Sequence, residues 1–420
     1  MIEANEQWLR HPISQIELDQ LVKESYCRLV KRPGDKEPSE CFSLTKRETG
    51  WVMSSSYFVG IDWLEEGKSA VRVKPKFDHE DNQIEINYLS MLEEALKEPK
   101  NFDQLDGLLY VDFNRPSIPV PRQDDMLSLF LVSEFLHVIK RITDKGLRKS
   151  YYLVEANQSS KIKGKILIPQ NIKKNNIRGN YSDNYCRYQE FGVDIPENRI
   201  LKKAVVISSH LLDIYHSDVV KQLKQTISDV FPKWKNVKSE CDPNKIREGK
   251  VNPFFKEYII AIRLAKLILR KTAFNQVLHE ANMTSTPPYW IDMSKLFEMY
   301  VLSKLRDRFG NDVIYHPHFR GQEPDYLLNG SDGHLPYIID AKYKRYGEHS
   351  IETDDIRQFS GYGRMKSVRK ALNVTDHSLI PCLIIYPEHE SNDFIPPSDK
   401  WIDEGRYLDV YKLGVTLPII

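Results

Sequence analysis

Three charged side chains in the last third of the 420-residue chain have the types and spacing of a hydrolytic site. Asp325 follows Pro324, and fifteen residues later the sequence is Asp340-Ala341-Lys342. Residues i and i+2 of a strand point to one face, so Asp340 and Lys342 share a face. Two carboxylates and an ammonium are costly to bury together unless a cation joins them. Carboxylate oxygens suit Mg²⁺, and the lysine could orient or help to deprotonate a water that attacks a phosphodiester.

Two paired strands must carry this pattern. The segment 337–343 is apolar apart from Asp340 and Lys342, which is typical of a buried central strand. Tyr326–Leu328 is a second strand candidate, and the turn sequence NGSDG at 329–333 predicts a hairpin between the two. That hairpin would bring Asp325 beside Asp340. A surface hairpin with an ordinary ion pair is the alternative that these residues leave open.

Two predicted helices flank the hairpin. The first covers 294–309, with Ser294 as a candidate cap, and carries Glu298 among apolar neighbours. The second covers 353–371 and carries Gln358 and Tyr362, whose i, i+4 spacing places them on one face. Two less favoured alternatives stay open: Glu298 as a solvated acid on the polar side of its helix, and Gln358 with Tyr362 as an incidental polar pair.

In this order and spacing, the four elements resemble the PD-(D/E)XK nuclease superfamily. The resemblance implies that Asp325 and Asp340 hold Mg²⁺, or Mn²⁺ in its place, and that Lys342 serves the nucleophile. Glu298 matches the helix glutamate that many of these nucleases use near the metal. Gln358 and Tyr362 are similar to the QxxxY motif of the RecB-like branch, which implies that they position a phosphate or a water.

Longer stretches are similar to the McrC family, the nuclease subunits of McrBC modification-dependent restriction systems. The specific matches are 292–301, 324–326, 339–344, 355–358 and 385–387, and looser ones are 73–77, 91–92, 163–166, 188–191 and 198–202. The resemblance implies a Mg²⁺-dependent endonuclease that cuts double-stranded DNA carrying a modification of the 5-methylcytosine type. It also implies a partner, a McrB-like hexameric AAA+ GTPase that the chain activates.

Other chemistry has less support. The nearest approach to a P-loop, Gly67-Lys68-Ser69, has Asp62 where the first glycine is needed, so we expect this chain to bind no nucleotide. His316 and His318 lie on one face of a predicted strand and could bind a metal. Without a clear third ligand, we favour a structural or DNA-facing strand there.

The cysteine pattern, the amino-terminal residues and the lack of long apolar runs predict a cytoplasmic protein. The five cysteines are scattered and form no CxxC pair, which predicts reduced thiols rather than disulfides or a zinc site. The amino terminus lacks the basic and apolar segments of a signal peptide, and no apolar run is long enough to span a membrane. We therefore expect no membrane partner.

The net charge of +1 conceals an uneven distribution. The stretch 140–178 contains eleven Lys or Arg residues against only Asp144 and Glu155. Such a stretch is either a surface that follows DNA phosphates or a solvated face of mixed use. The sequence does not decide between them.

Together these patterns predict an α/β (α+β) protein with three regions. Residues 1–120 form a strand-rich region that we expect to bind the AAA+ GTPase, and residues 121–285 form a mainly helical region with the basic stretch. Residues 286–420 form a PD-(D/E)XK nuclease domain, a mixed central sheet flanked by helices. Two alternatives stay open: a stand-alone repair or antiphage nuclease of the same superfamily, and a non-catalytic adaptor that activates an AAA+ partner.

Overall fold

The structure is a computed structural model that describes most of the chain. The described residues are 1–5, 11–13, 25–31, 37–47, 50–75, 77–79, 82–84, 86–97, 107–121, 125–215, 218–243, 256–275, 283–317, 319, 323–330, 334–344, 352–388, 395, 401–403 and 405–419. The predictions for His318 and for turn positions 331–333 lie outside these residues. Among the described residues, no helix has both the length and the apolar character needed to cross a membrane.

The chain divides into two compact units. One contains residues 1–119 and 285–420, and the other contains residues 120–284. The strands β11 (Ile118–Pro121) and β15 (Met283–Thr286) contain the points where the chain passes from one unit to the other. The sequence analysis treated 1–120 and 286–420 as separate regions, whereas their contacts group them in one unit, because β16 (Tyr289–Asp292) pairs with β6 (Phe58–Glu65) and β10 (Leu109–Val111).

The amino-terminal part of the first unit is rich in strands, as predicted. A five-stranded sheet has the order β1-β7-β6-β16-β10, and a four-stranded sheet has the order β2-β5-β4-β3. Buried aromatic residues, among them Phe42, Trp51 and Trp290, form the core of this region. The bounds not yet given are β1 (Ile2–Asn5), β2 (His11–Ile13), β3 (Tyr26–Val30), β4 (Ser39–Arg47), β5 (Gly50–Ser55), β7 (Ser69–Lys74), β8 (Phe77–His79), β9 (Asn82–Ile84) and α2 (Tyr88–Lys97).

The carboxyl-terminal part of the first unit contains a six-stranded mixed sheet of order β17-β18-β19-β20-β22-β21. Its strands β17 to β19 are antiparallel, whereas β19, β20 and β22 run parallel to one another. The strand bounds are β17 (Val313–Tyr315), β18 (Tyr326–Leu328), β19 (Tyr337–Ala341), β20 (Cys382–Glu388), β21 (Ile402–Asp403) and β22 (Val410–Thr416). The prediction of a mixed central sheet is confirmed.

Helices flank this sheet, as expected for a PD-(D/E)XK core. Side chains of α9 (Thr353–Tyr362) and α10 (Lys366–Ala371) join Ile338, Ile384 and neighbouring strand residues in one buried cluster. Helix α8 (Met293–Phe309) contacts β17 and β19, and it also packs against α2. Two sequence predictions were wrong in detail. Asp292, rather than Ser294, caps α8 by accepting a bond from the Lys295 amide, and the helix predicted over 353–371 is broken after Tyr362 by a turn at Gly363.

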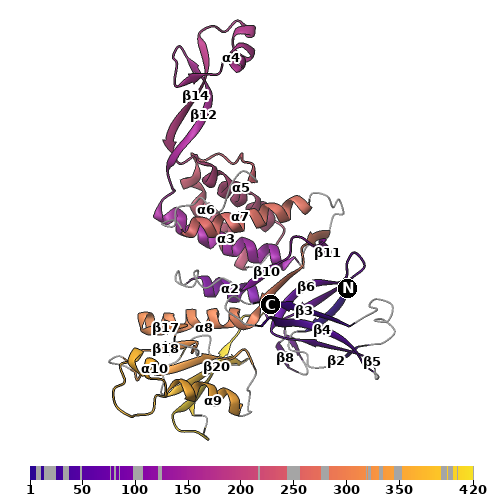
Figure 1. Cartoon of the computed structure of the whole chain (residues 1–420), viewed down its shortest axis with the longest axis vertical. Helices are drawn as coiled ribbons and strands as arrows, with labels where there is room; N and C mark the ends of the chain where they lie inside the picture. Colours follow the sequence, from indigo (N-terminus) through magenta and orange to yellow (C-terminus); the bar gives the residue numbers. More distant parts are fainter. Residues whose placement is uncertain are drawn as a thin grey trace. The chain divides into compact units, whose positions relative to one another are not determined.

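The second unit combines a helical body with a long ribbon. The body contains α3 (Met126–Lys145), α5 (Pro196–Leu212), α6 (Asp218–Val230) and α7 (Lys256–Asn275), and a 3-10 turn, Phe231–Trp234, follows α6. Strands β12 (Ser150–Ser159) and β14 (Asp183–Gly192) pair along their whole length and extend away from these helices (Figure 1). The ribbon ends in a tip that contains β13 (Lys165–Ile166) and the short helix α4 (Ile168–Lys174). The predicted helical middle region is confirmed, whereas the ribbon was not foreseen.

Candidate active site

The sheet pairing places the two predicted metal-binding aspartates opposite each other. Leu327 pairs with Ile338 and Tyr326 with Ile339 across β18 and β19. One step further along this register, Asp325 faces Asp340. The Asp325 carboxylate also accepts a 2.9 Å hydrogen bond from the amide of Ala341, which fixes it against the end of β19. The predicted hairpin therefore brings both carboxylates to one point.

Strand β19 buries an acid because its neighbours cover both faces. All five of its residues are buried, and Asp340 is only 2% exposed. Ile338 belongs to the cluster beneath α9 and α10, and alternation directs Asp340 and Lys342 to that same side. The Lys342 ammonium lies 2.7 Å from the Asp340 carboxylate. Asp340 is therefore a buried acid with a cationic neighbour, at the edge where the strand ends.

Helix α9 supplies the next contacts of the lysine. The Gln358 side-chain oxygen accepts a 3.1 Å bond from the Lys342 ammonium, and the Gln358 amide donates a 3.0 Å bond to the Tyr362 hydroxyl. The Asp355 carboxylate lies 3.9 Å from the same ammonium. Gln358 and Tyr362 thus form a chain of contacts that ends on Lys342.

Helix α8 brings Glu298 to the same place. Its backbone oxygen accepts a 2.6 Å bond from the hydroxyl of Tyr326, the first residue of β18. Glu298, His316 and Asp325 each offer one ligand atom, and these atoms all lie within 4.8 Å of one another. The six predicted site residues therefore lie in one neighbourhood. From the sequence, His316 was considered as a possible metal ligand, but a structural or DNA-facing strand was favoured, because nothing in its position indicated the two carboxylates that it approaches.

Burial and the repulsion between neighbouring carboxylates dominate the electrostatics of this cluster. Burial, followed by the nearby charges of Asp340 and Glu298, raises the pKa of Asp325 well above its ordinary value. Burial also raises the pKa of Asp340, although the Lys342 ammonium opposes that shift. Burial disfavours the charged form of Lys342, but Asp340, Asp325 and Asp355 outweigh it and raise the pKa of the ammonium. Lys342 is therefore held in its charged form.

The donor set fits a divalent cation. Buried carboxylates that repel one another are stabilised by a hard cation, and carboxylates are the ligands that Mg²⁺ and Mn²⁺ prefer. The imidazole Nε2 of His316, directed at the same carboxylates, is buried and makes no hydrogen bond within the described part of the chain. Glu298, Asp325 and Asp340 could hold such an ion, with His316 beside them.

Several basic side chains of the stretch 140–178 form ion pairs with glutamates. Lys145 and Arg141 pair with Glu257, Arg148 pairs with Glu197, and Lys163 pairs with Glu190. The basic side chains that remain exposed in the ribbon tip are accompanied by exposed isoleucines. The structure thus divides the stretch between the end of α3 and the tip of the ribbon.

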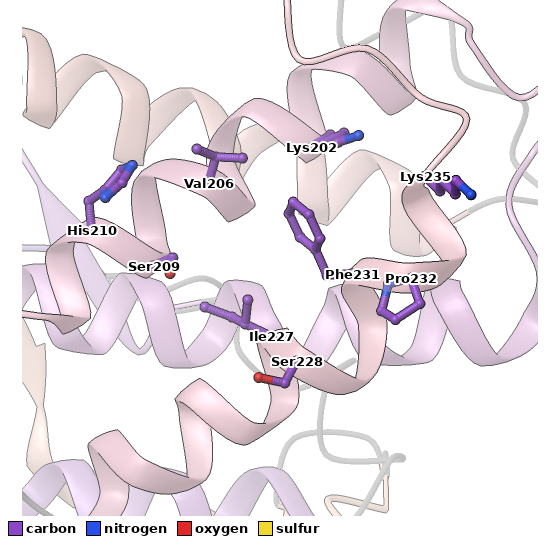
Figure 2. A pocket seen from close by; sticks show the side chains of 9 residues that line it. All are labelled: Lys202, Val206, Ser209, His210, Ile227, Ser228, Phe231, Pro232 and Lys235. Atoms are coloured by element: carbon purple, nitrogen blue, oxygen red, sulfur yellow. The ribbon is translucent and has the colours of Figure 1, made fainter.

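A separate pocket of about 640 Å³ lies in the helical body of the second unit. Figure 2 shows its lining from α5 and from the end of α6 with the following turn, including Val206, Ile227 and Phe231. The ammonium of Lys202 at this pocket donates to the backbone oxygens of Trp234 and Val237. None of the predicted site residues lines it, so we assign it no part in the chemistry.

The mixed sheet, its flanking helices and the facing aspartates with Lys342 define a protein with a PD-(D/E)XK-type core. The family model described as "McrBC 5-methylcytosine restriction system component" matches residues 56–387. The chain belongs to that family of restriction system components.

Comparison with curated proteins returned no match. Among solved structures, a chain from the Thermococcus gammatolerans assembly of McrB AAA+ hexamers with bound McrC is similar, with 16% identity and a TM-score of 0.36. The similarity covers 87% of this chain and 79% of that one. A chain of the Thermococcus gammatolerans McrBC complex is similar over 61% of this chain and 67% of that one, with 16% identity and a TM-score of 0.28.

Proposed function

We propose that this chain is the metal-dependent DNA endonuclease subunit of a modification-dependent restriction system of the 5-methylcytosine type. The observation that carries the proposal is Asp325 facing Asp340 at the end of β19, with Lys342 2.7 Å from Asp340 and Glu298 beside Asp325. An ordinary ion pair does not explain acids whose pKa values are raised by burial, with Asp340 and Glu298 adding to the shift at Asp325. A site for phosphodiester hydrolysis does explain them.

Asp325, Asp340 and Glu298 would hold Mg²⁺ or Mn²⁺. When bound, such an ion supplies a Lewis acid for the phosphate and lowers the pKa of an attacking water. Lys342, kept charged by its acidic neighbours, orients that water and stabilises the negative charge that develops on the phosphate. Its raised pKa favours this role over that of a proton acceptor.

Gln358 and Tyr362 would act through the lysine. The Gln358 oxygen accepts from the Lys342 ammonium, and the Tyr362 hydroxyl holds the Gln358 amide. A lysine side chain has many rotamers, and contacts of this kind restrict it to the orientation that reaches the phosphate. We therefore assign these two residues to positioning.

We further propose double-stranded DNA as the substrate and an AAA+ GTPase hexamer of the McrB type as the partner. Family membership supports this pairing, and so does the failure of the P-loop pattern at Asp62, which leaves nucleotide hydrolysis to another chain. The sequence analysis assigned partner binding to residues 1–120. The exposed apolar side chains of the ribbon tip offer a second surface for a protein partner.

The variant Asp340→Ala tests the proposal. We expect it to abolish cleavage of methylated DNA while it still binds the AAA+ partner and stimulates GTP hydrolysis, because the carboxylate acts at the metal and not at the interface. Loss of both activities would show that Asp340 is structural. Vigorous metal-dependent cutting by the purified chain alone would favour a stand-alone nuclease. If the unaltered chain stimulates GTP hydrolysis but cuts no DNA under any condition, the result would favour a non-catalytic adaptor.

A further inference from the structure

His316, the residue after β17, is held in an unusual backbone conformation. Its φ is 43°, in the left-handed region that residues other than glycine rarely adopt. Its amide donates a 2.9 Å bond to the backbone oxygen of Asp325, and its ring lies 4.1 Å from that of Tyr315, centroid to centroid. Strain of this kind persists where the surrounding structure enforces it, and it is concentrated at functional sites.

This conformation directs the imidazole toward two of the proposed metal-binding carboxylates. The Nε2 atom lies 3.4 Å from the Glu298 carboxylate. One ligand atom of Asp325 completes the group within 4.8 Å. Nε2 is buried and makes no hydrogen bond to any residue that the structure describes. A buried ring nitrogen that faces two carboxylates has the surroundings of a ligand atom.

We propose that His316 is a nitrogen ligand of the cation held by Glu298 and Asp325, and that it shifts the metal preference of the site from Mg²⁺ toward Mn²⁺. The inference rests on the proposed function, which supplies the cation. Mg²⁺ favours oxygen ligands, whereas Mn²⁺ accepts carboxylates and also binds imidazole more readily. A simple ion pair between a protonated His316 and Glu298 is the competing explanation.

Pulsed electron paramagnetic resonance of the full chain loaded with Mn²⁺ separates these explanations. In protein labelled with ¹⁵N-histidine, we expect a nitrogen coupling to the manganese. His316→Gln should remove this coupling, and His377→Gln, which changes an exposed histidine of the same unit, should retain it. The wild-type spectrum alone shows whether any histidine nitrogen binds the manganese, and the comparison of the two variants assigns that nitrogen to His316.

Calorimetric titration of the same proteins without DNA measures the preference of the site for Mn²⁺ over Mg²⁺. We expect wild type to bind Mn²⁺ at least about tenfold more tightly than Mg²⁺, and His316→Gln to lose most of that difference. Manganese that binds wild type without nitrogen coupling, or coupling that persists in His316→Gln, would overturn the assignment of His316. Failure of wild type to bind either ion would instead contradict the proposed metal site.

Discussion

At the scale of single residues, the site combines groups that oppose one another. Asp340 is buried, Asp325 faces it from a partly buried position, and Glu298 adds a third carboxylate. The Lys342 ammonium lies 2.7 Å from the Asp340 carboxylate. Such an arrangement lowers stability unless a cation is bound, and proteins commonly accept this cost at functional sites.

Asp325→Asn should therefore stabilise the metal-free chain and abolish cleavage. The pKa of this acid is raised in the folded state, so its ionisation above pH 4 opposes folding, and the opposition grows as the pH rises. A neutral amide keeps an oxygen for the Ala341 amide and removes the charge. At pH 8 with chelator, we expect the free energy of unfolding to rise by about 1 kcal/mol or more. A lower stability in urea denaturation would contradict this account.

Gln358→Ala should reduce cleavage about tenfold while leaving Mn²⁺ affinity within about twofold of wild type, because Gln358 contacts Lys342 and not the carboxylates. Gln225→Ala is a matched control, since Gln225 also makes an i, i+4 side-chain bond, to Asp229 on the exposed face of its helix. An unchanged cleavage rate in Gln358→Ala would remove this residue from the site.

Residue types and spacing predicted most of the site, but not all of it. Alternation on one strand was enough to pair Asp340 with Lys342, and the i, i+4 rule was enough to pair Gln358 with Tyr362. His316 was not predicted as a ligand, because the strand ends at Tyr315 and a left-handed turn redirects the next side chain. No pattern in the sequence predicts a left-handed backbone conformation at a histidine.

At the scale of elements, strands far apart in the sequence determine where α8 begins. Strand β16 leads directly into α8 and pairs with β6, and Asp292 ends the strand and caps the helix. The sequence predicted the helix but assigned its cap to Ser294, because both residues are good caps and only the strand end distinguishes them. The break after Tyr362 was also missed, since helical periodicity continues through Gly363.

Gly60→Ala should test how closely β6 and β16 approach. An added Cβ at Gly60 would lie 2.0 Å from the backbone oxygen of Tyr289, which cannot move without breaking the sheet. We expect a loss of about 3 kcal/mol in the free energy of unfolding. At Gly361, in α9, a Cβ meets nothing within 4 Å, so Gly361→Ala should be neutral or slightly stabilising. Equal thermal stabilities of the two variants would contradict the packing described here.

At the scale of the whole molecule, the near-zero net charge conceals separate surfaces. Acids gather at the end of β19, while the exposed bases of 161–178 lie on the tip of the ribbon with Ile162, Ile168, Ile172 and Ile177. The basic stretch is visible in the sequence, but its position on the ribbon is not, because the β12–β14 pairing joins segments more than twenty residues apart. Exposed apolar side chains in such a group are typical of a surface that a protein partner covers.

The double variant Ile168→Asp with Ile177→Asp should weaken binding to the AAA+ partner at least about tenfold and reduce GTPase stimulation in parallel, since two apolar contacts are replaced by charges. Mn²⁺ affinity should stay at the wild-type value. Leu408→Asp, which alters an equally exposed apolar residue of the other unit, serves as control. Unchanged partner binding in a pull-down would remove the tip from the interface.

The central claim is that the facing aspartates form a metal-dependent nuclease site, and one cleavage assay tests it directly. Wild type, Asp325→Asn and Asp340→Asn are each combined with the AAA+ partner, GTP and methylated double-stranded DNA, and the cut product is measured against Mg²⁺ and Mn²⁺ concentration. We expect wild type to cut only when the metal is present and both variants to be inactive at every concentration. Cleavage by either variant at a rate near that of wild type would contradict the account.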